Sequence, residues 1–363
     1  MDRMRFLLIC AVLPLSLIAC SQKVTEPERA PATFKAPATI AEPAADVHFH
    51  TKNFVQEGIR LSEVIPILDS AKVKRAAVFG IPLQQNWDMS TGVKPGYYLH
   101  DDQELYYYSA VDAFLALEFQ ELSEAQKPRL DPMIVGFNPT DGRATDHIRN
   151  MLLRFPGVFS GIGEFSIEKE VVSSKVAGRN ANINDPALDN ILRFAAETGL
   201  VVLLHCDVDA IISGNENQPT YFQELSELFA RHPETTIVWA HSGLGRFVKA
   251  RPEHTKLVAQ LLKKSRNLFI DISWDVVLNQ LLDGEGVLLP EWKEFLMENS
   301  QRVLFGTDVV APKSADYAQL VGRYHGLFQQ LPEAAAENIR IGNYQSIFDS
   351  ARRKIRAWEM ANS

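Results

Sequence analysis

The sequence contains little cysteine and no run of basic residues. Its three cysteines in 363 residues are Cys10, Cys20 and Cys206, and the first two lie within the first twenty residues. A domain that begins after this segment holds Cys206 alone, so it cannot form an internal disulfide. The formal net charge of −8 and the absence of a basic cluster argue against a nucleic acid as partner.

The sequence also lacks an apolar run long enough to cross a membrane. Its most apolar stretch, residues 6–19, is short for a membrane-spanning helix and contains Pro14. Arg3 and Arg5 precede this stretch, which is the order of a secretory signal peptide. We therefore expect the N-terminal segment to direct export rather than to fold.

The end of that segment, "LIAC" at residues 17–20, resembles the lipobox of bacterial lipoproteins. The resemblance implies that residues 1–20 are a lipoprotein signal peptide, that Cys20 is lipidated, and that this lipid is the exported chain's only membrane contact. Ser21 stands where many inner-membrane lipoproteins carry aspartate, which implies the periplasmic side of the outer membrane in a Gram-negative host. The alternative is an ordinary signal peptide that is cut nearby.

The next segment, residues 21–44, consists mainly of Pro, Ala, Thr and Glu and has hardly any large apolar side chain. Such a composition buries too little surface to offset the entropy of ordering, so we expect a flexible tether. The whole sequence is 46% hydrophobic and 23% charged, which is typical of a globular protein. We assign residues 45–357 to one catalytic domain, and no pattern predicts an oligomeric state.

One pattern recurs eight times along this domain: a short apolar run, a polar residue at its end, and then an amphipathic stretch. Continuous apolar runs are typical of parallel strands that are buried on both faces. Eight such units predict an α/β fold of the (β/α)8 TIM-barrel type. A doubly wound open sheet is the alternative, but it normally has a glycine-rich loop after its first strand, which is missing here. The runs are residues 44–50, 73–82, 130–138, 157–164, 200–207, 235–243, 268–273 and 302–308.

Histidines and carboxylates stand at the ends of these runs, where the active site of a barrel lies. His48 and His50 are two apart and would face the same side of a strand. With His205 and Asp308 they make a set of three imidazoles and one carboxylate, which suits Zn²⁺ and also Mn²⁺, Fe²⁺ or Co²⁺. Each residue alone has a structural alternative, such as a capped helix or a buried hydrogen bond, but their joint placement predicts a metal site.

The motifs "DVHFH", "GIGE", "LLHCD", "WAHSGLG", "LFGTD" and "IGNYQSIF" together resemble the amidohydrolase superfamily, in its amidohydrolase-related (amidohydrolase 2) branch, over about residues 45–350. The resemblance implies that His48, His50, His205 and Asp308 are metal ligands. It also implies that His241 lies beside the bound water or substrate, and that Asp308 passes a proton from the attacking water to the leaving group.

One departure from that family concerns Glu164. Members with two metals often carry a bridging carboxylated lysine after the fourth strand, where this sequence has Glu164. A glutamate at this place could bridge two ions, or could instead orient another ligand or bind substrate. We expect one divalent metal ion, most simply zinc, with a second ion through Glu164 as the alternative.

A second departure is the long polar segment of residues 165–185, which we interpret as a lid or recognition element. Basic residues here and after the sixth run could hold an anionic group of the substrate, and an aromatic residue after the seventh run could shape the pocket. Solvated surface charge is the structural alternative for each. The residues that we predict to contact substrate are Lys169, Arg246 and Trp274. Lys175 and Arg179 are further candidates for anion binding, and Asp275 is a further candidate for shaping the pocket.

These observations predict a metal-dependent hydrolase that uses a metal-activated water to cleave an ester, lactone or amide bond of a small substrate. The substrate is anionic if the cations named above bind it. A metal-dependent non-oxidative decarboxylase is the alternative within the enzyme class. A lipoprotein that keeps the barrel only for binding is the alternative outside it.

Overall fold

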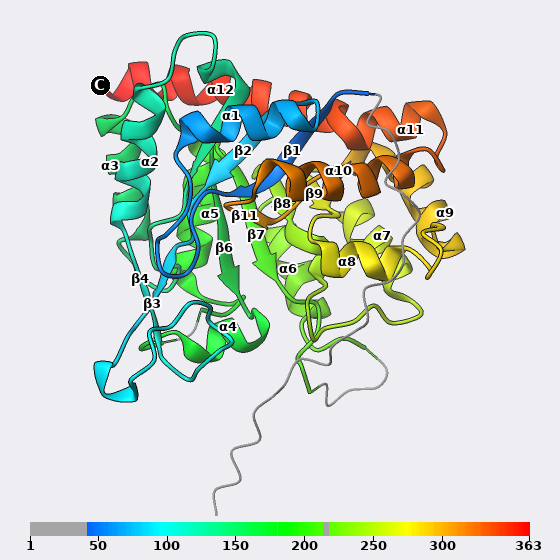
Figure 1. Cartoon of the computed structure of the whole chain (residues 1–363), viewed down its shortest axis with the longest axis horizontal. Helices are drawn as coiled ribbons and strands as arrows, with labels where there is room; N and C mark the ends of the chain where they lie inside the picture. Colours follow the sequence, from blue (N-terminus) through cyan, green and yellow to red (C-terminus); the bar gives the residue numbers. More distant parts are fainter. Residues whose placement is uncertain (1–41, 180, 213–217) are drawn as a thin grey trace, which may run out of the picture. The chain divides into compact units, whose positions relative to one another are not determined.

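The computed structural model describes residues 42–179, 181–212 and 218–363. The predicted signal peptide, the lipidation site at Cys20 and residues 21–41 of the predicted tether lie outside these residues. The described residues belong to one compact unit, in which helices surround a sheet of parallel strands (Figure 1). None of the helices in these ranges is both long and apolar enough to span a bilayer.

The main sheet has nine strands in the order β10-β9-β8-β7-β6-β5-β2-β1-β11, and all neighbouring pairs are parallel. Each of the eight apolar runs forms a strand, and the eighth run extends into a second short piece. The predicted (β/α)8 barrel is therefore confirmed. The strands are β1 (Ala44–His50), β2 (Val73–Phe79), β5 (Leu130–Ile134), β6 (Gly161–Ile167), β7 (Val201–Cys206), β8 (Ile237–Trp239), β9 (Leu268–Asp271), β10 (Val303–Leu304) and β11 (Val309–Val310).

The split eighth strand joins the two edges of the sheet. β10 pairs with β9, and β11 pairs with β1. Between these pieces, the amide of Val47 donates to the carbonyl of Phe305 at 3.1 Å, and the amide of Asp308 donates to the carbonyl of His48 at 2.8 Å. The buried carboxylate of Asp46 accepts from the amide (3.0 Å) and hydroxyl (2.6 Å) of Thr307. These bonds close the ring of strands and bring Asp308 beside His48.

Helices follow the strands and cover the outside of the ring (Figure 1). The α-helices are α1 (Leu61–Ser70), α2 (Ala110–Gln120), α3 (Ala144–Arg154), α4 (Glu170–Lys175), α5 (Pro186–Thr198), α6 (Phe222–Arg231), α7 (His254–Lys264), α8 (Asp275–Leu281), α9 (Pro290–Glu298), α10 (Ser314–Phe328), α11 (Glu333–Glu337) and α12 (Asn343–Asn362). Single turns occur at η1 (Met89–Thr91), η2 (Lys127–Arg129), η3 (Ala240–Gly243), η4 (Ser300–Arg302) and η5 (Asn338–Gly342).

Helix α5 illustrates how local sequence sets these boundaries. The side chain of Asp185 accepts from the amide of Ala187, and Pro186 occupies the first turn, where its missing N–H is not needed. Gly199 ends the helix in a left-handed conformation (φ 83°), and its amide donates to Ala195. The apolar side of α5 packs on the strands, with Leu188 and Ile191 fully buried.

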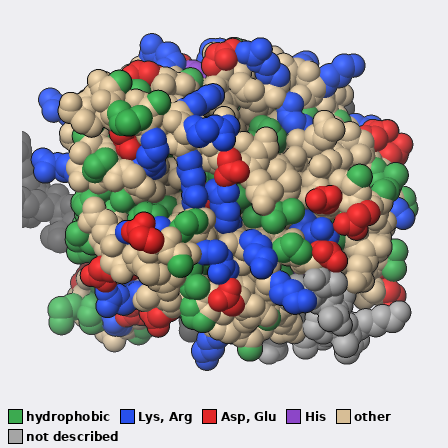
Figure 2. Space-filling view, turned by 90° about the horizontal axis from the view of Figure 1, so that it is seen from above, with side chains coloured by type: hydrophobic (Ala, Val, Ile, Leu, Met, Phe, Trp, Pro, Cys, Tyr) green, Lys and Arg blue, Asp and Glu red, His purple; other side chains and the backbone are tan. Residues whose placement is uncertain are grey.

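Helix α12 covers the amino ends of the strands through a buried ion-pair cluster. The carboxylate of Asp131, at the start of β5, accepts from Arg75 (2.9 Å), from Arg352 of α12 (2.6 Å) and from the hydroxyl of Tyr344 of α12 (2.7 Å). Figure 2 shows the molecule from this side, where lysine and arginine side chains are frequent on the surface. The cluster fixes α12 to the strands at the end opposite to the predicted active site.

At the carboxyl ends of the strands, the barrel carries a small additional layer. The hairpin of β3 (Leu83–Gln85) and β4 (Leu105–Tyr107) packs on α4 around a separate apolar cluster that includes Leu105 and Val172. The ammonium group of Lys175 donates to the carbonyls of Tyr98 and Asp101 and ties the two parts together. This layer lies over the mouth of the barrel and builds one wall of its pocket.

Candidate metal centre

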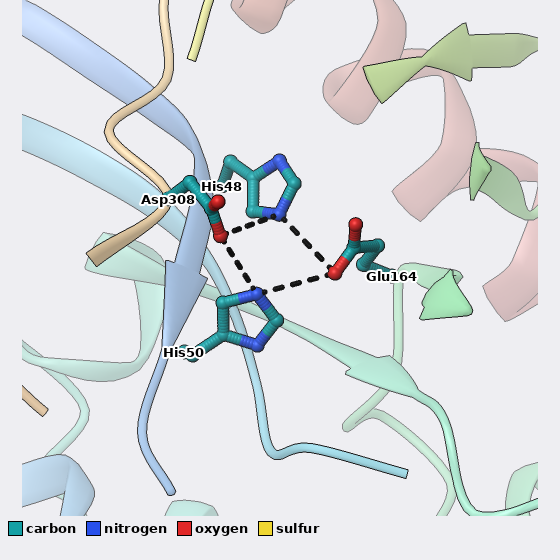
Figure 3. Close-up of side chains that lie close together, drawn as sticks. All are labelled: His48, His50, Glu164 and Asp308. Carbon is teal, nitrogen blue, oxygen red and sulfur yellow. Dashed lines mark ion pairs between the residues drawn. The ribbon is translucent and has the colours of Figure 1, made fainter. Parts of the chain in front are cut away.

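His48 and His50 point into the barrel from the carboxyl end of β1. Because they are two residues apart on a strand, their side chains lie on the same face, and both are buried. Asp308 stands between β10 and β11, and Glu164 lies within β6, at a register shift between Ile162 and Phe165. A bulge of this kind redirects a side chain, which turns Glu164 toward the two histidines (Figure 3).

Four side chains converge on one point. The Oδ1 atom of Asp308 lies 3.0 Å from Nε2 of His50 and 3.3 Å from Nε2 of His48. On the other side, Oε2 of Glu164 lies 3.4 Å from Nε2 of His50 and 3.7 Å from Nε2 of His48 (Figure 3). All four ligand atoms lie within 4.8 Å of one another, which is the spacing of side chains that can share one ion.

The structure places His205 on the other side of Glu164. Its Nδ1 atom is 2.6 Å from Oε1 of Glu164, and its Nε2 atom is 3.1 Å from Oδ1 of Asp207. The Nε2 atom of His241 is 3.7 Å from the same Oε1. Of the predicted ligands, His48, His50 and Asp308 are therefore gathered together with Glu164. His205, His241 and Glu164 form a second group that shares only the glutamate.

Asp271 and Ser273, on and just after β9, hold two of the histidines, and the sequence analysis missed both. The Oδ2 atom of Asp271 is 3.0 Å from Nδ1 of His48, and its Oδ1 atom accepts from the amide of His241 at 2.7 Å. The hydroxyl of Ser273 lies 2.9 Å from Nδ1 of His241 and 3.1 Å from Nδ1 of His48. The sequence signal was an aspartate inside the apolar run "LFIDIS", since a buried carboxylate requires partners.

These contacts leave ring nitrogens directed at the centre. When the His48 ring is neutral and its Nδ1 atom donates to Asp271, its Nε2 atom carries the lone pair that a metal ion can use. The buried Nε2 atoms of His48 and His241 have no hydrogen-bond partner within the described ranges. A buried polar atom without a partner is unfavourable unless a ligand satisfies it. Orphaned imidazole nitrogens beside two carboxylates fit a divalent metal ion.

The carboxylate charges of the site agree with this fit. Burial opposes protonation of His48 and His50, but the same carboxylates raise the pKa of both imidazoles, so a metal ion would displace protons from them. Burial by itself would raise the pKa of Asp308, but the neighbouring His48 and His50 lower it below its ordinary value. Burial opposes ionisation of Glu164 as well, yet Lys169 and His205 hold the pKa of this carboxyl well below its usual range. Both carboxylates are therefore ionised at neutral pH, as ligands for a metal must be.

Three residues of the site adopt left-handed backbone conformations: His241 (φ 57°), Trp274 (φ 79°) and Asp308 (φ 53°). This conformation is uncommon for residues other than glycine, and it clusters at functional sites. Next to Asp308, Gly306 permits a close approach, because a Cβ atom at this position would lie 2.9 Å from Cβ of His48. Tertiary contacts, rather than local sequence preference, therefore set the direction of these side chains.

A pocket of about 190 Å³ opens above the centre, and His50, Glu164 and Asp308 form part of its wall. The three predicted substrate contacts line it. Lys169 lies 3.3 Å from Oε1 of Glu164. The guanidinium of Arg246 stands 5.4 Å from the centroid of the Trp274 ring and donates to the hydroxyl of Tyr97 at 3.3 Å.

The further candidates lie elsewhere. Lys175 donates to backbone carbonyls beneath the hairpin layer, Arg179 pairs with Asp185, and Asp275 is exposed at the start of α8. None of these three lines the pocket. Sequence reasoning also missed an aromatic wall from the segment between β2 and α2, because no periodic pattern marks it. Its members are Tyr97 and Tyr98, together with Phe54 from the loop after β1.

Comparison with known proteins agrees with this architecture. The amidohydrolase family profile matches residues 92–343. Among solved structures, an uncharacterised TIM-barrel protein from Bordetella bronchiseptica is similar, with 13% identity and a TM-score of 0.52 over 85% of this chain and 99% of that chain. An amidohydrolase from Burkholderia multivorans with bound HEPES gives 12% identity and a TM-score of 0.50 over the same shares. No curated protein matches the sequence.

Proposed function

The chain belongs to the amidohydrolase family, and from this premise we propose that it is a metal-dependent hydrolase of an ester, lactone or amide bond in a small anionic substrate. One observation carries the proposal. His48, His50, Glu164 and Asp308 direct ligand atoms to one point at the wall of the pocket, and the buried Nε2 atom of His48 has no other partner among the described residues.

We propose zinc as the ion, with Mn²⁺, Fe²⁺ and Co²⁺ as alternatives that the same imidazole and carboxylate donors accept. A divalent ion held there would lower the pKa of a water molecule and polarise the carbonyl oxygen of the substrate. We assign one ion to His48, His50, Glu164 and Asp308. His205 supports this assignment from the second group, because its Nδ1 atom fixes the other oxygen of Glu164 at 2.6 Å.

Asp308 is the proposed proton carrier. Its side chain is 12% exposed and lines the pocket, and its Oδ2 atom is 3.7 Å from Nε2 of His241. It is thus placed to take a proton from the attacking water and to deliver it to the leaving group. Burial lowers the pKa of His241, so its imidazole is neutral and orients the substrate through hydrogen bonding.

Arg246, Lys169 and Trp274 support an anionic substrate of modest size. Both cations line the pocket, where Arg246 lies over the Trp274 ring and Lys169 lies against Glu164. A guanidinium in this position can bind a carboxylate or phosphate with two parallel hydrogen bonds. Aromatic walls from Tyr97 and Tyr98 favour a planar or apolar body attached to that anion.

The direct test is a screen of lactones, esters, amides and carboxylated aromatics with the metal-reconstituted protein in ¹⁸O-labelled water. Hydrolysis incorporates ¹⁸O into the product, and we expect Asp308→Asn to lower kcat about 100-fold or more with the fold intact. Asp275→Asn, at an exposed carboxylate outside the pocket, serves as control. Release of CO2 without ¹⁸O incorporation would instead identify a decarboxylase, and metal binding without any turnover would identify a binding protein.

We further propose that the enzyme is exported and anchored to the cell envelope by a lipid on Cys20. Labelling with a fatty-acid analogue in a bacterial host should be lost in Cys20→Ala and kept in Cys10→Ala, whose cysteine lies in the same segment. Labelling of the Cys20→Ala chain would overturn this assignment.

A further inference from the structure

Lys169 lies beside the second ligand group of the centre. Its Nζ atom is 3.3 Å from Oε1 of Glu164. The same oxygen faces Nδ1 of His205 at 2.6 Å and Nε2 of His241 at 3.7 Å. The lysine side chain is only 13% exposed. A second metal ion would have to bind between Glu164, His205 and His241. The Oε1 atom of Glu164, which these residues share, already contacts the ammonium group of Lys169.

The backbone around Lys169 is fixed by the same carboxylate that holds His205. Oδ2 of Asp207 accepts from the amide of Glu170 at 2.7 Å, and its Oδ1 atom is 3.1 Å from Nε2 of His205. The amide of Lys169 itself donates to the hydroxyl of Ser173 at 2.8 Å. Lys169 is thus built into the site by the turn that joins β6 to α4.

The two oxygens of Glu164 serve different partners. Oε2 faces His48 and His50, whereas Oε1 faces Lys169, His205 and His241. A divalent ion in the second group would have to bind Oε1 within a few ångströms of the ammonium group. Two cations at such a short distance repel each other strongly in a buried site. An ion beside Oε2 lies on the far side of the carboxylate and experiences less of this repulsion.

We propose that the Lys169 ammonium group takes the place of a second metal ion and restricts the centre to one divalent ion, bound by His48, His50, Glu164 and Asp308. This inference rests on the proposed metal site. It also gives Lys169 a task other than substrate binding, because its ammonium group neutralises Glu164.

The experiment is a titration of the metal-free full chain with Zn²⁺ by calorimetry, checked by elemental analysis after gel filtration. The key variant is Lys169→Met, which keeps most of the side-chain length and removes the charge. Lys169→Arg keeps the charge, and Lys175→Met removes a cation from the same helix at a place remote from Glu164. Circular dichroism establishes that each variant is folded.

The wild type, Lys169→Arg and Lys175→Met should each bind one equivalent tightly. Lys169→Met should bind two, the second at least about tenfold more tightly than in the wild type. Two tight equivalents in the wild type, or one in Lys169→Met, would overturn this inference and leave the metal site standing. Absence of binding in the wild type would overturn the proposed function and the inference with it.

Discussion

Asp271 shows how single residues outside the pocket determine the centre. It is completely buried, and its two oxygens contact Nδ1 of His48 and the amide of His241. A carboxylate in this position fixes the tautomer and the orientation of an imidazole and raises its basicity as a ligand. The sequence motifs suggest that His48 and His241 belong to the site. Asp271 and Ser273 determine the direction in which the two rings point.

We predict that Asp271→Asn weakens metal binding by about 10- to 100-fold, because the amide cannot hold the His48 ring as a carboxylate does. Competition with a chromophoric chelator measures the dissociation constant directly. The matched control is Asp275→Asn, which alters an exposed carboxylate at the end of the same strand-to-helix connection. Equal affinity in Asp271→Asn and the wild type would show that Asp271 has only a structural role.

At the scale of elements, the apolar runs predict all eight strands of the barrel, because strands buried on both faces need uninterrupted apolar sequence. The arrangement around Glu164 could not be predicted in the same way. It depends on a register shift in β6 that turns the side chain between His50 and His205, and register shifts leave no periodic signal. The sequence predicted His205 as a ligand together with His48, His50 and Asp308, with Glu164 as a further candidate, and the structure places His205 on the other oxygen of Glu164.

The hairpin layer was also beyond prediction. Its strands β3 and β4 have three residues each, which is too short for a recognisable alternation. The anchoring of α12 depends on Asp131, a polar residue inside an apolar run, and its partners lie more than fifty residues away in the sequence. Such long-range polar contacts follow from the closed topology and not from local pattern.

We predict that the attachment of α12 to the strands contributes to the free energy of unfolding. Asp131→Ala should lower the free energy of unfolding by about 3 kcal/mol, because it leaves the half-buried Arg75 and Arg352 without their shared carboxylate. The control is Glu234→Ala, which removes the exposed partner of Arg266. It should change the free energy of unfolding by less than about 1 kcal/mol. Urea unfolding of the metal-free proteins compares the two, and similar losses would contradict the proposed role of the Asp131 cluster.

For the molecule as a whole, the buried His254 makes stability depend on pH. Burial lowers the pKa of His254 to about 4, against an ordinary value of 6.5. Above pH 6.5 both folded and unfolded states hold it neutral. Between pH 6.5 and 4 the unfolded state binds a proton that the folded state refuses, so stability falls as the pH falls through this window.

We predict that His254→Asn reduces this acid-dependent loss of unfolding free energy by roughly 3 kcal/mol at most. Urea titrations at several pH values between 7 and 4.5, with chelator present so that metal release does not contribute, measure it. His100→Asn, at an exposed histidine, should leave the pH dependence unchanged. A His254→Asn chain with the full wild-type dependence would exclude His254 as its source.

The central claim is that His48, His50, Glu164 and Asp308 hold a divalent metal ion at the wall of the pocket. Elemental analysis of the full chain, purified without chelators, tests it most directly when paired with His50→Asn. We predict about one equivalent of zinc, or of a related divalent ion, per wild-type chain and almost none in the folded variant. A wild-type chain that is purified without metal and binds none on reconstitution would contradict the account.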